Sequence, residues 1–211
     1  MTATPRAFFR SLALAAALAL SACAVPGFQD PPQLHSLTPA TEFPADLPRV
    51  EQQLLVELPM ANSGLDVSRI ALRTAPTSLA YFADVNWTDR APGLIQTLAV
   101  ESLENTGRIV SVARDTVGLR ADWLLKTDLR DFQAEYDGPP GQTAPDIRMR
   151  LTAKLVRMPG RTIEASRTFE AVVPAEAASM QAVIAAFDQA ASMVMRDLAA
   201  WTLESIPQAG S

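Results

Sequence analysis

The alternation of apolar and polar positions predicts that much of the chain forms β-strands. Short apolar runs predict strands at residues 53–58, 67–73, 79–85 and 108–113. Residues 147–155 alternate strictly, which is typical of a strand with one buried face. Residues 122–129 and 132–136 alternate in opposite phase. Because a strand cannot change its buried face without an irregularity, we predict a β-bulge near Arg130–Asp131.

The strand at 147–155 is followed by a turn signal, Met158-Pro159-Gly160, and then by a returning apolar pattern. A three-residue loop at 158–160 would keep the apolar side chains of both strands on one face. This loop predicts four cross-strand pairs: Leu155–Ile163, Met149–Phe169, Lys154–Glu164 and Arg148–Glu170.

Two segments have apolar residues at helical spacing. The first has Thr88 or Asp89 as a candidate cap, Pro92 in its first turn and Gly107 at its end. The second covers about residues 177–205 and would be about 40 Å long. The predicted fold class is α+β, with a mainly antiparallel sheet of about six or seven strands covered by two helices, the C-terminal one long.

The N-terminus has the three-part pattern of a secretory signal. Arg6 and Arg10 precede a short apolar run, and the run ends in Leu20-Ser21-Ala22-Cys23. These four residues resemble a bacterial lipobox, which implies cleavage before Cys23. Its thiol would then carry a diacylglycerol and its new amino group a third acyl chain such as palmitate. A plain secretory signal with a chance cysteine is the alternative.

Cys23 is the only cysteine of the chain, and several acyl chains at one residue give stable membrane anchoring. The next residue is Ala24 rather than Asp. The sorting rule of enteric-type bacteria then favours the periplasmic face of the outer membrane, with inner-membrane retention as the alternative. Six prolines between residues 24 and 48 predict an extended tether, of which only 34–37 is expected to dock.

The predicted organisation has three parts. Residues 1–22 are a signal peptide, residues 23–49 are the lipidated cysteine with its proline-rich tether, and residues 50–206 are one domain. The chain has 211 residues, of which 48% are hydrophobic and 19% are charged, so it can bury a core of ordinary size. Its net charge of −5 argues against nucleic acid as a partner.

Candidate chemistry is sparse. The only histidine, His35, lies in the predicted tether beside Ser36, where catalytic geometry would be hard to hold. Asp128 and Asp131 are interpreted as charge pairs on a solvated sheet face rather than as general acids. We therefore expect no catalytic residue, no metal site and no cofactor, and we do not expect an enzyme.

Three aromatic residues, Tyr81, Phe82 and Trp87, precede the first predicted helix. Their pattern has two interpretations. They pack the core and the start of the helix, or they form a surface for a ligand or a partner.

Several short motifs between Gly64 and Tyr136 resemble one known family in order and spacing. The matching positions are Gly64 to Arg73, Leu79 to Phe82, Trp87, Ala91 to Leu94, Leu103, Glu104, Gly107, Arg108, Asp122, Leu125, Phe132 and Tyr136. The family is the ABC-type transport auxiliary lipoproteins, the PqiC/YmbA-like group. This family often has Tyr where the chain has His35, so docking of the tether on the sheet does not follow from the resemblance.

The resemblance implies a role as an accessory subunit. Such lipoproteins accompany an ABC permease, its ATPase and a periplasmic lipid-binding protein of the mammalian-cell-entry type, and together these move phospholipids or other hydrophobic molecules between membranes. Only Cys23 carries over as a defined functional position. Two alternatives are an envelope-assembly or enzyme-activating lipoprotein and a lipid-carrying lipoprotein. A homo-oligomer that matches a symmetric machine is also left open.

Overall fold

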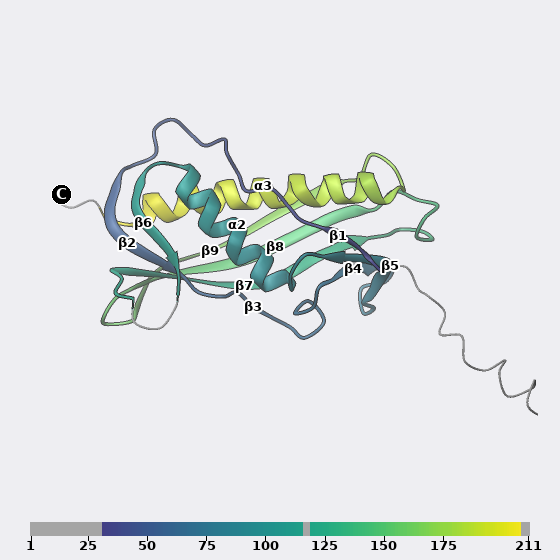
Figure 1. Cartoon of the computed structure of the whole chain (residues 1–211), viewed down its shortest axis with the longest axis horizontal. Coiled ribbons are helices and arrows are strands. Elements are labelled where there is room, and N and C mark those ends of the chain that lie inside the picture. The colour runs from purple at the N-terminus through teal and green to yellow at the C-terminus, as the bar shows by residue number, and fades with distance from the viewer. Residues whose placement is uncertain (1–30, 116–118, 208–211) are drawn as a thin grey trace, which may run out of the picture. The chain divides into compact units, whose positions relative to one another are not determined.

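The computed structural model describes residues 31–115 and 119–207, in which one mixed sheet lies against two helices (Figure 1). The predicted signal peptide and Cys23 lie outside the described residues. The strands are β1 (Gln33–His35), β2 (Val50–Val56), β3 (Met60–Ala61), β4 (Arg69–Arg73), β5 (Ala80–Trp87), β6 (Ile109–Arg114), β7 (Trp123–Glu135), β8 (Asp146–Arg157) and β9 (Thr162–Pro174). The helices are α2 (Ala91–Asn105) and α3 (Met180–Ser205).

Strand β7 organises the sheet. On one edge it pairs antiparallel with β8, which pairs in turn with β9. On its other edge β2, β3 and β4 follow one another in parallel, near Trp123, Asp128 and Gln133 respectively. Strands β5 and β1 extend the sheet beyond β4, and β6 extends it beyond β2.

The α+β class and the long C-terminal helix are confirmed, but two details of the predicted sheet are wrong. The described residues form nine strands rather than six or seven, and the sheet is mixed rather than mainly antiparallel. Alternation identifies a strand and its buried face, but it does not identify the neighbouring strand. Three consecutive segments of the chain therefore lie in line along one edge of β7, which no local pattern indicated.

The predicted β-bulge is confirmed. Leu129 pairs with Leu151 and Asp131 pairs with Arg150, so Arg130 is the extra residue in β7. The irregularity turns Phe132 toward the helices. Beyond the bulge, the polar side chains of β7 lie on the face of the sheet that points away from the helices.

The predicted register of the β8–β9 hairpin is wrong by two residues. The turn extends to Arg161, which has a left-handed φ of 57°, and a further irregularity follows Leu155. The observed pairs are Leu155–Ala165, Leu151–Phe169, Met149–Ala171, Lys154–Ser166 and Arg148–Val172. Ile163 lies opposite Val156 instead and is 55% exposed. Of the two expected ion pairs, only Arg148–Glu170 forms, as a diagonal contact.

The ends of the helices follow the sequence in part. Arg90 is the N-cap of α2 and makes no side-chain capping bond, so the predicted cap at Thr88 or Asp89 is wrong. The Asp89 carboxylate accepts a hydrogen bond from the backbone N–H of Arg90 at 2.6 Å instead. Pro92 lies in the first turn as predicted, and Gly107 has a left-handed φ of 60° just past the helix.

The core lies between the sheet and the two helices, which contact each other and cover the same face (Figure 1). Helix α3 packs on β8 and β9, and α2 packs on β6 and β2. Three aromatic rings meet at the centre of the core. Phe187 of α3 lies 5.2 Å from both Trp87 and Phe132, measured between ring centroids. These rings join the last helix to β5 and β7.

Replacing Phe187→Ala should lower the free energy of unfolding by about 3–5 kcal/mol, because it leaves a cavity among fully buried rings. Met193→Ala is the matched control on the same helix, where the side chain is 37% exposed. That change should cost less than about 1 kcal/mol. Urea unfolding of both variants measures the difference. Equal losses would contradict the central role of the ring cluster.

Candidate functional site

The segment that precedes β2 packs against the domain over most of its described length. Strand β1 adds to the edge of β5 in parallel, with His35 opposite Trp87. Leu37, Ala40 and Leu47 are all buried. Docking therefore extends beyond residues 34–37, the part of the predicted tether that was expected to dock.

Polar contacts fasten this segment to both helices. Thr38 donates hydrogen bonds from its backbone N–H and its hydroxyl to the carboxylate of Asp188 on α3, at 2.7–2.8 Å. The backbone N–H of Ala40 donates to the hydroxyl of Ser102 on α2 at 2.9 Å, and Asn105 donates back to the carbonyl of Ala40. We name residues 36–49 the strap, since they cross the helices and are held at several points.

His35 lies directly before the strap and makes structural contacts. Its carbonyl accepts a hydrogen bond from the N–H of Thr88, and its ring Nε2 is buried without a hydrogen-bond partner. Within residues 31–115 and 119–207, no three His, Cys, Asp or Glu side chains are close enough to hold a metal ion. No helix of this described part is long and apolar enough to span a membrane.

The structure separates the three predicted aromatic residues. Trp87 is 2% exposed and stacks on Phe132, so it packs the core, as the first interpretation had it. Tyr81 is half-buried, with its hydroxyl donating to the carbonyl of Gly64 and the guanidinium of Arg69 3.7 Å from its ring centroid. Only Tyr81 and Phe82 retain enough exposure to take part in a surface.

A polar network lies on the face of the sheet opposite the helices. It was not predicted as a unit, although Asp131 was expected to form a charge pair. The carboxylate of Asp131 is 5% exposed and accepts from Arg150 at 2.5 Å. Gln133 is fully buried and donates to the carboxylates of Asp131 and Glu135, at 3.3 and 3.0 Å. The alternation after the bulge carried this signal, because residues 131, 133 and 135 are all polar, and the first two lie opposite arginines of β8.

Arg148 closes the network by bridging two carboxylates, those of Glu135 and Glu170. The hydrogen bond to Glu135 is the main cause that raises the pKa of Arg148 above its ordinary value. A groove of about 500 Å³ lies beside the bridge and is lined by Arg73 and Glu135 among others. Its charges are largely paired with one another, so the network stabilises the sheet and leaves little unpaired charge for chemistry.

The described molecule is thus an α+β domain with a fastened N-terminal strap and a charge-paired sheet face. Residues 33–199 match the family described as the ABC-type transport auxiliary lipoprotein component, and the chain belongs to this family.

The chain is also similar to three other proteins. A crystal structure of protein XCC0632 from Xanthomonas campestris is 32% identical, with a TM-score of 0.76 over 82% of this chain and 95% of that one. A second crystal structure, of an uncharacterised protein, has a TM-score of 0.62 over 81% of this chain and 97% of that one, at 14% identity. The protein bll6063 of Bradyrhizobium diazoefficiens is 30% identical over 59% of this chain, which spans 32% of that protein's length.

Replacing Asp131→Ala should lower the free energy of unfolding by about 2 kcal/mol, because it removes the buried carboxylate that pairs with Arg150 and accepts one hydrogen bond from Gln133. Asp128→Ala on the same strand is the control, since Asp128 pairs at the surface with Arg130 at 2.7 Å. That change should cost less than about 1 kcal/mol. Thermal unfolding compares the two, and a loss at Asp128 as large as that at Asp131 would contradict the proposed weight of the network.

Proposed function

We propose that this chain is a non-enzymatic, lipid-anchored accessory subunit of an ABC-type system that moves phospholipids or other hydrophobic molecules between membranes. Acyl groups on Cys23 hold it at the periplasmic face of the outer membrane. Its domain docks a periplasmic partner of the mammalian-cell-entry type, which connects it to the permease and ATPase. The observation that carries the proposal is the family match over residues 33–199, which begins shortly after the lipobox-like Leu20-Ser21-Ala22-Cys23.

The position of β1 supports a short connection to the membrane. Cys23 and Gln33 are separated by ten peptide steps, which reach at most about 35 Å when fully extended. Because the chain joins the sheet at Gln33, the first residue of β1, the end of the domain that carries β1 stays within that distance of the anchor.

The packing of the domain supports a docking role over a carrier role. Trp87, Phe132 and Phe187 fill the centre of the space between sheet and helices, where a lipid carrier would need a cavity. The buried carboxylate of Asp131 is committed to Arg150 and Gln133 rather than poised for acid–base work. Both observations favour a body that binds other proteins through its surface.

Cys23→Ser should move the protein from the membrane fraction to the soluble periplasmic fraction, because it removes the proposed site of acylation. Fractionation with antibody detection measures the change, and mass spectrometry of the wild-type N-terminus supplies the direct check. A Cys23→Ser protein that stays with the membranes, or an unacylated wild-type N-terminus, would contradict the anchor.

Ala24→Asp tests the membrane of residence. Expressed in a host that follows the enteric sorting rule, the wild-type chain should fractionate with the outer membrane and the Ala24→Asp variant with the inner membrane. Ala24→Ser is the matched control and should remain in the outer membrane. A wild-type chain found in the inner membrane would overturn this part of the proposal.

The transport role is tested by the partners of the full-length lipoprotein. Genes for a permease, an ATPase and a mammalian-cell-entry-type protein beside its own gene, together with co-purification of that protein, are the expected result. Neighbouring genes for peptidoglycan synthesis or outer-membrane assembly would favour the envelope-assembly alternative instead.

A further inference from the structure

A row of apolar side chains crosses the polar face of the sheet at one end. The row runs through five adjacent strands, each member opposite the next: Ala113 of β6, Leu55 of β2, Leu124 of β7, Val156 of β8 and Ile163 of β9. The three central members form a small apolar cluster separate from the main core, and Ala121 and Met158 pack against it. Other apolar side chains on this face, such as Val172, lie outside the row, so the row is a distinct feature.

The row is covered only in part. Its three central members, Leu55, Leu124 and Val156, are 4–7% exposed. Ile163, at the end of the row, is 55% exposed, and Leu119, five residues before Leu124 in the sequence, is 53% exposed. A groove of about 650 Å³ lies beside the cluster, lined by Leu119, Arg120, Met158 and Pro159 among others. The apolar end of the row and the groove together leave room for a side chain from outside.

The groove and the adjoining turn carry unpaired positive charge. Arg120 and Arg161 are exposed, and neither makes an ion pair with another described residue. Two acids lie at the same end, but Asp122 accepts the N–H of Gln53 at 2.8 Å, and Glu164 pairs with Arg157. Asp115 at this end is exposed, and Glu51 of β2 pairs with Arg49. A chain with a net charge of −5 thus has unpaired arginines in and beside a groove that Leu119, Met158 and Asp122 also line.

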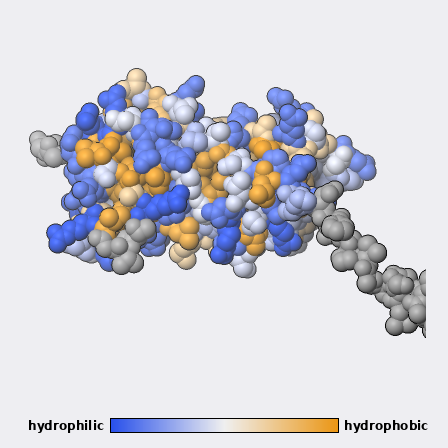
Figure 2. Space-filling model, in the orientation of Figure 1, coloured by the Kyte–Doolittle hydropathy of each residue, from blue (hydrophilic) through white to orange (hydrophobic). Residues whose placement is uncertain are grey.

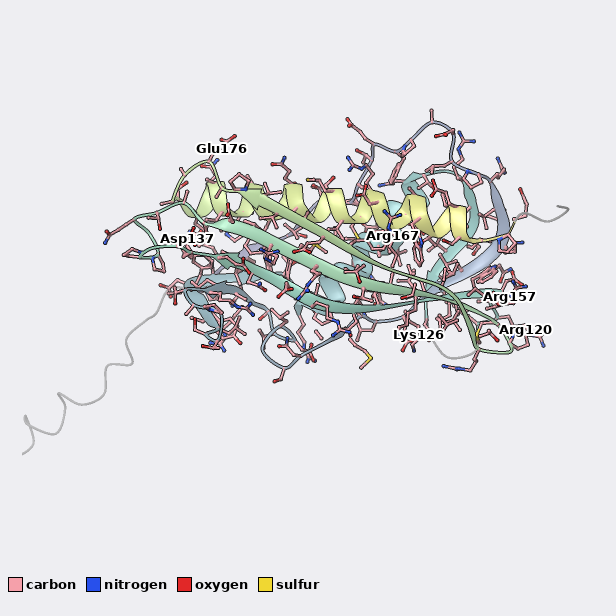
Figure 3. The ribbon with its side chains drawn as sticks, turned by 180° about the vertical axis from the view of Figure 1, so that it is seen from behind. Arg120, Lys126, Asp137, Arg157, Arg167 and Glu176 are labelled. Atoms are coloured by element: carbon pink, nitrogen blue, oxygen red, sulfur yellow. The ribbon has the colours of Figure 1, made fainter. Side chains whose placement is uncertain are left out.

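This end lies far from the point where the chain joins the sheet. The turn after β8 adjoins the Trp123 end of β7, and β4, which links β5 and β1 to the sheet, pairs near Glu135 at the other end. Twelve strand steps separate these two ends of β7, or about 40 Å. Figure 3 shows the labelled Arg120 and Arg157 at one end of the sheet, and Asp137 and Glu176 at the other. On the face seen in Figure 2, apolar side chains form small patches at both ends and at the centre of the domain.

We propose that this end of the sheet binds an acidic segment of a partner protein, which inserts an apolar side chain into the groove beside Leu119 and Met158. We name the groove and its rim of Arg120, Arg157 and Arg161 the distal surface. Its acidic, apolar occupant follows from the charges and the groove. Only the identification of that occupant with a transport component rests on the proposed function.

The geometry favours a protein segment over two other occupants. A bilayer takes up a broad set of protruding apolar side chains, whereas here Ile163 and Leu119 protrude but the three central members of the row are packed against Ala121 and Met158. In a two-fold contact between copies, this same patch would face itself and set arginine against arginine. An extended acidic segment can reach into the groove with one side chain, and its charge is opposite to that of the arginines.

Photo-cross-linking in cells tests the distal surface with the full-length lipoprotein. A benzophenone amino acid takes the place of Ile163 or, as the matched control, of Val172, which lies on the same face of β9 and is 44% exposed. The cross-linked peptide is identified by mass spectrometry. We expect about tenfold more cross-linked protein from position 163, joined to a peptide richer in Asp and Glu than in Lys and Arg.

Charge reversal supplies a second arm. Arg120→Glu, introduced together with the cross-linker at position 163, should lower the yield about fivefold, because it sets two acidic groups against each other. Arg196→Glu makes the same change in charge on α3 and should leave the yield unaltered. The melting temperatures of both variants are measured to show that each still folds.

The outcomes separate the inference from the proposed function. An acidic peptide from a protein with no part in transport would support the distal surface and contradict the transport role. Equal yields at the two positions, no cross-link at position 163, a basic peptide, a phospholipid adduct or a second copy of this chain would each overturn the inference.

Discussion

The fold depends on one strand, β7, keeping an apolar face toward the helices along its whole length. The extra residue Arg130 allows this, since Leu129 before it and Phe132 after it both face the helices. Without the bulge, the period of two would send Phe132 to solvent and bury Asp131 and Gln133 beneath α3. Because β2, β3, β4 and β8 all pair with β7, an error at this single position would disturb the rest of the sheet.

Features of the fold that have a local cause were predictable from the sequence. The change of phase marked the bulge, and Gly107 marked the end of α2 because glycine accepts a left-handed conformation without strain. Features that depend on residues far apart in the sequence were not predictable. The alignment of β2, β3 and β4 along one edge has no local pattern, and the hairpin register failed because Ile163, although apolar, lies exposed past an irregularity.

The candidate sites divide in the same way. Alternation after the bulge places Asp131, Gln133 and Glu135 on one face, so the polar network could have been predicted from the bulge. The docking of the strap could not have been predicted. Its prolines indicated an extended segment, but the contact that fastens it joins Thr38 to Asp188, which are 150 positions apart in the chain. The apolar row was equally hidden, because its members come from five strands whose order the sequence does not show.

The strap has a mechanical consequence for any protein held by its N-terminus. Tension along β1 loads its hydrogen bonds to β5 in shear, so these bonds must yield together rather than one after another. If they yield, the next resistance is the grip of Asp188 on Thr38, followed by the contacts of Ala40 with α2. Pulling forces that break the pairing of β1 with β5 are thereby passed to the two helices in sequence before they reach the rest of the β-sheet.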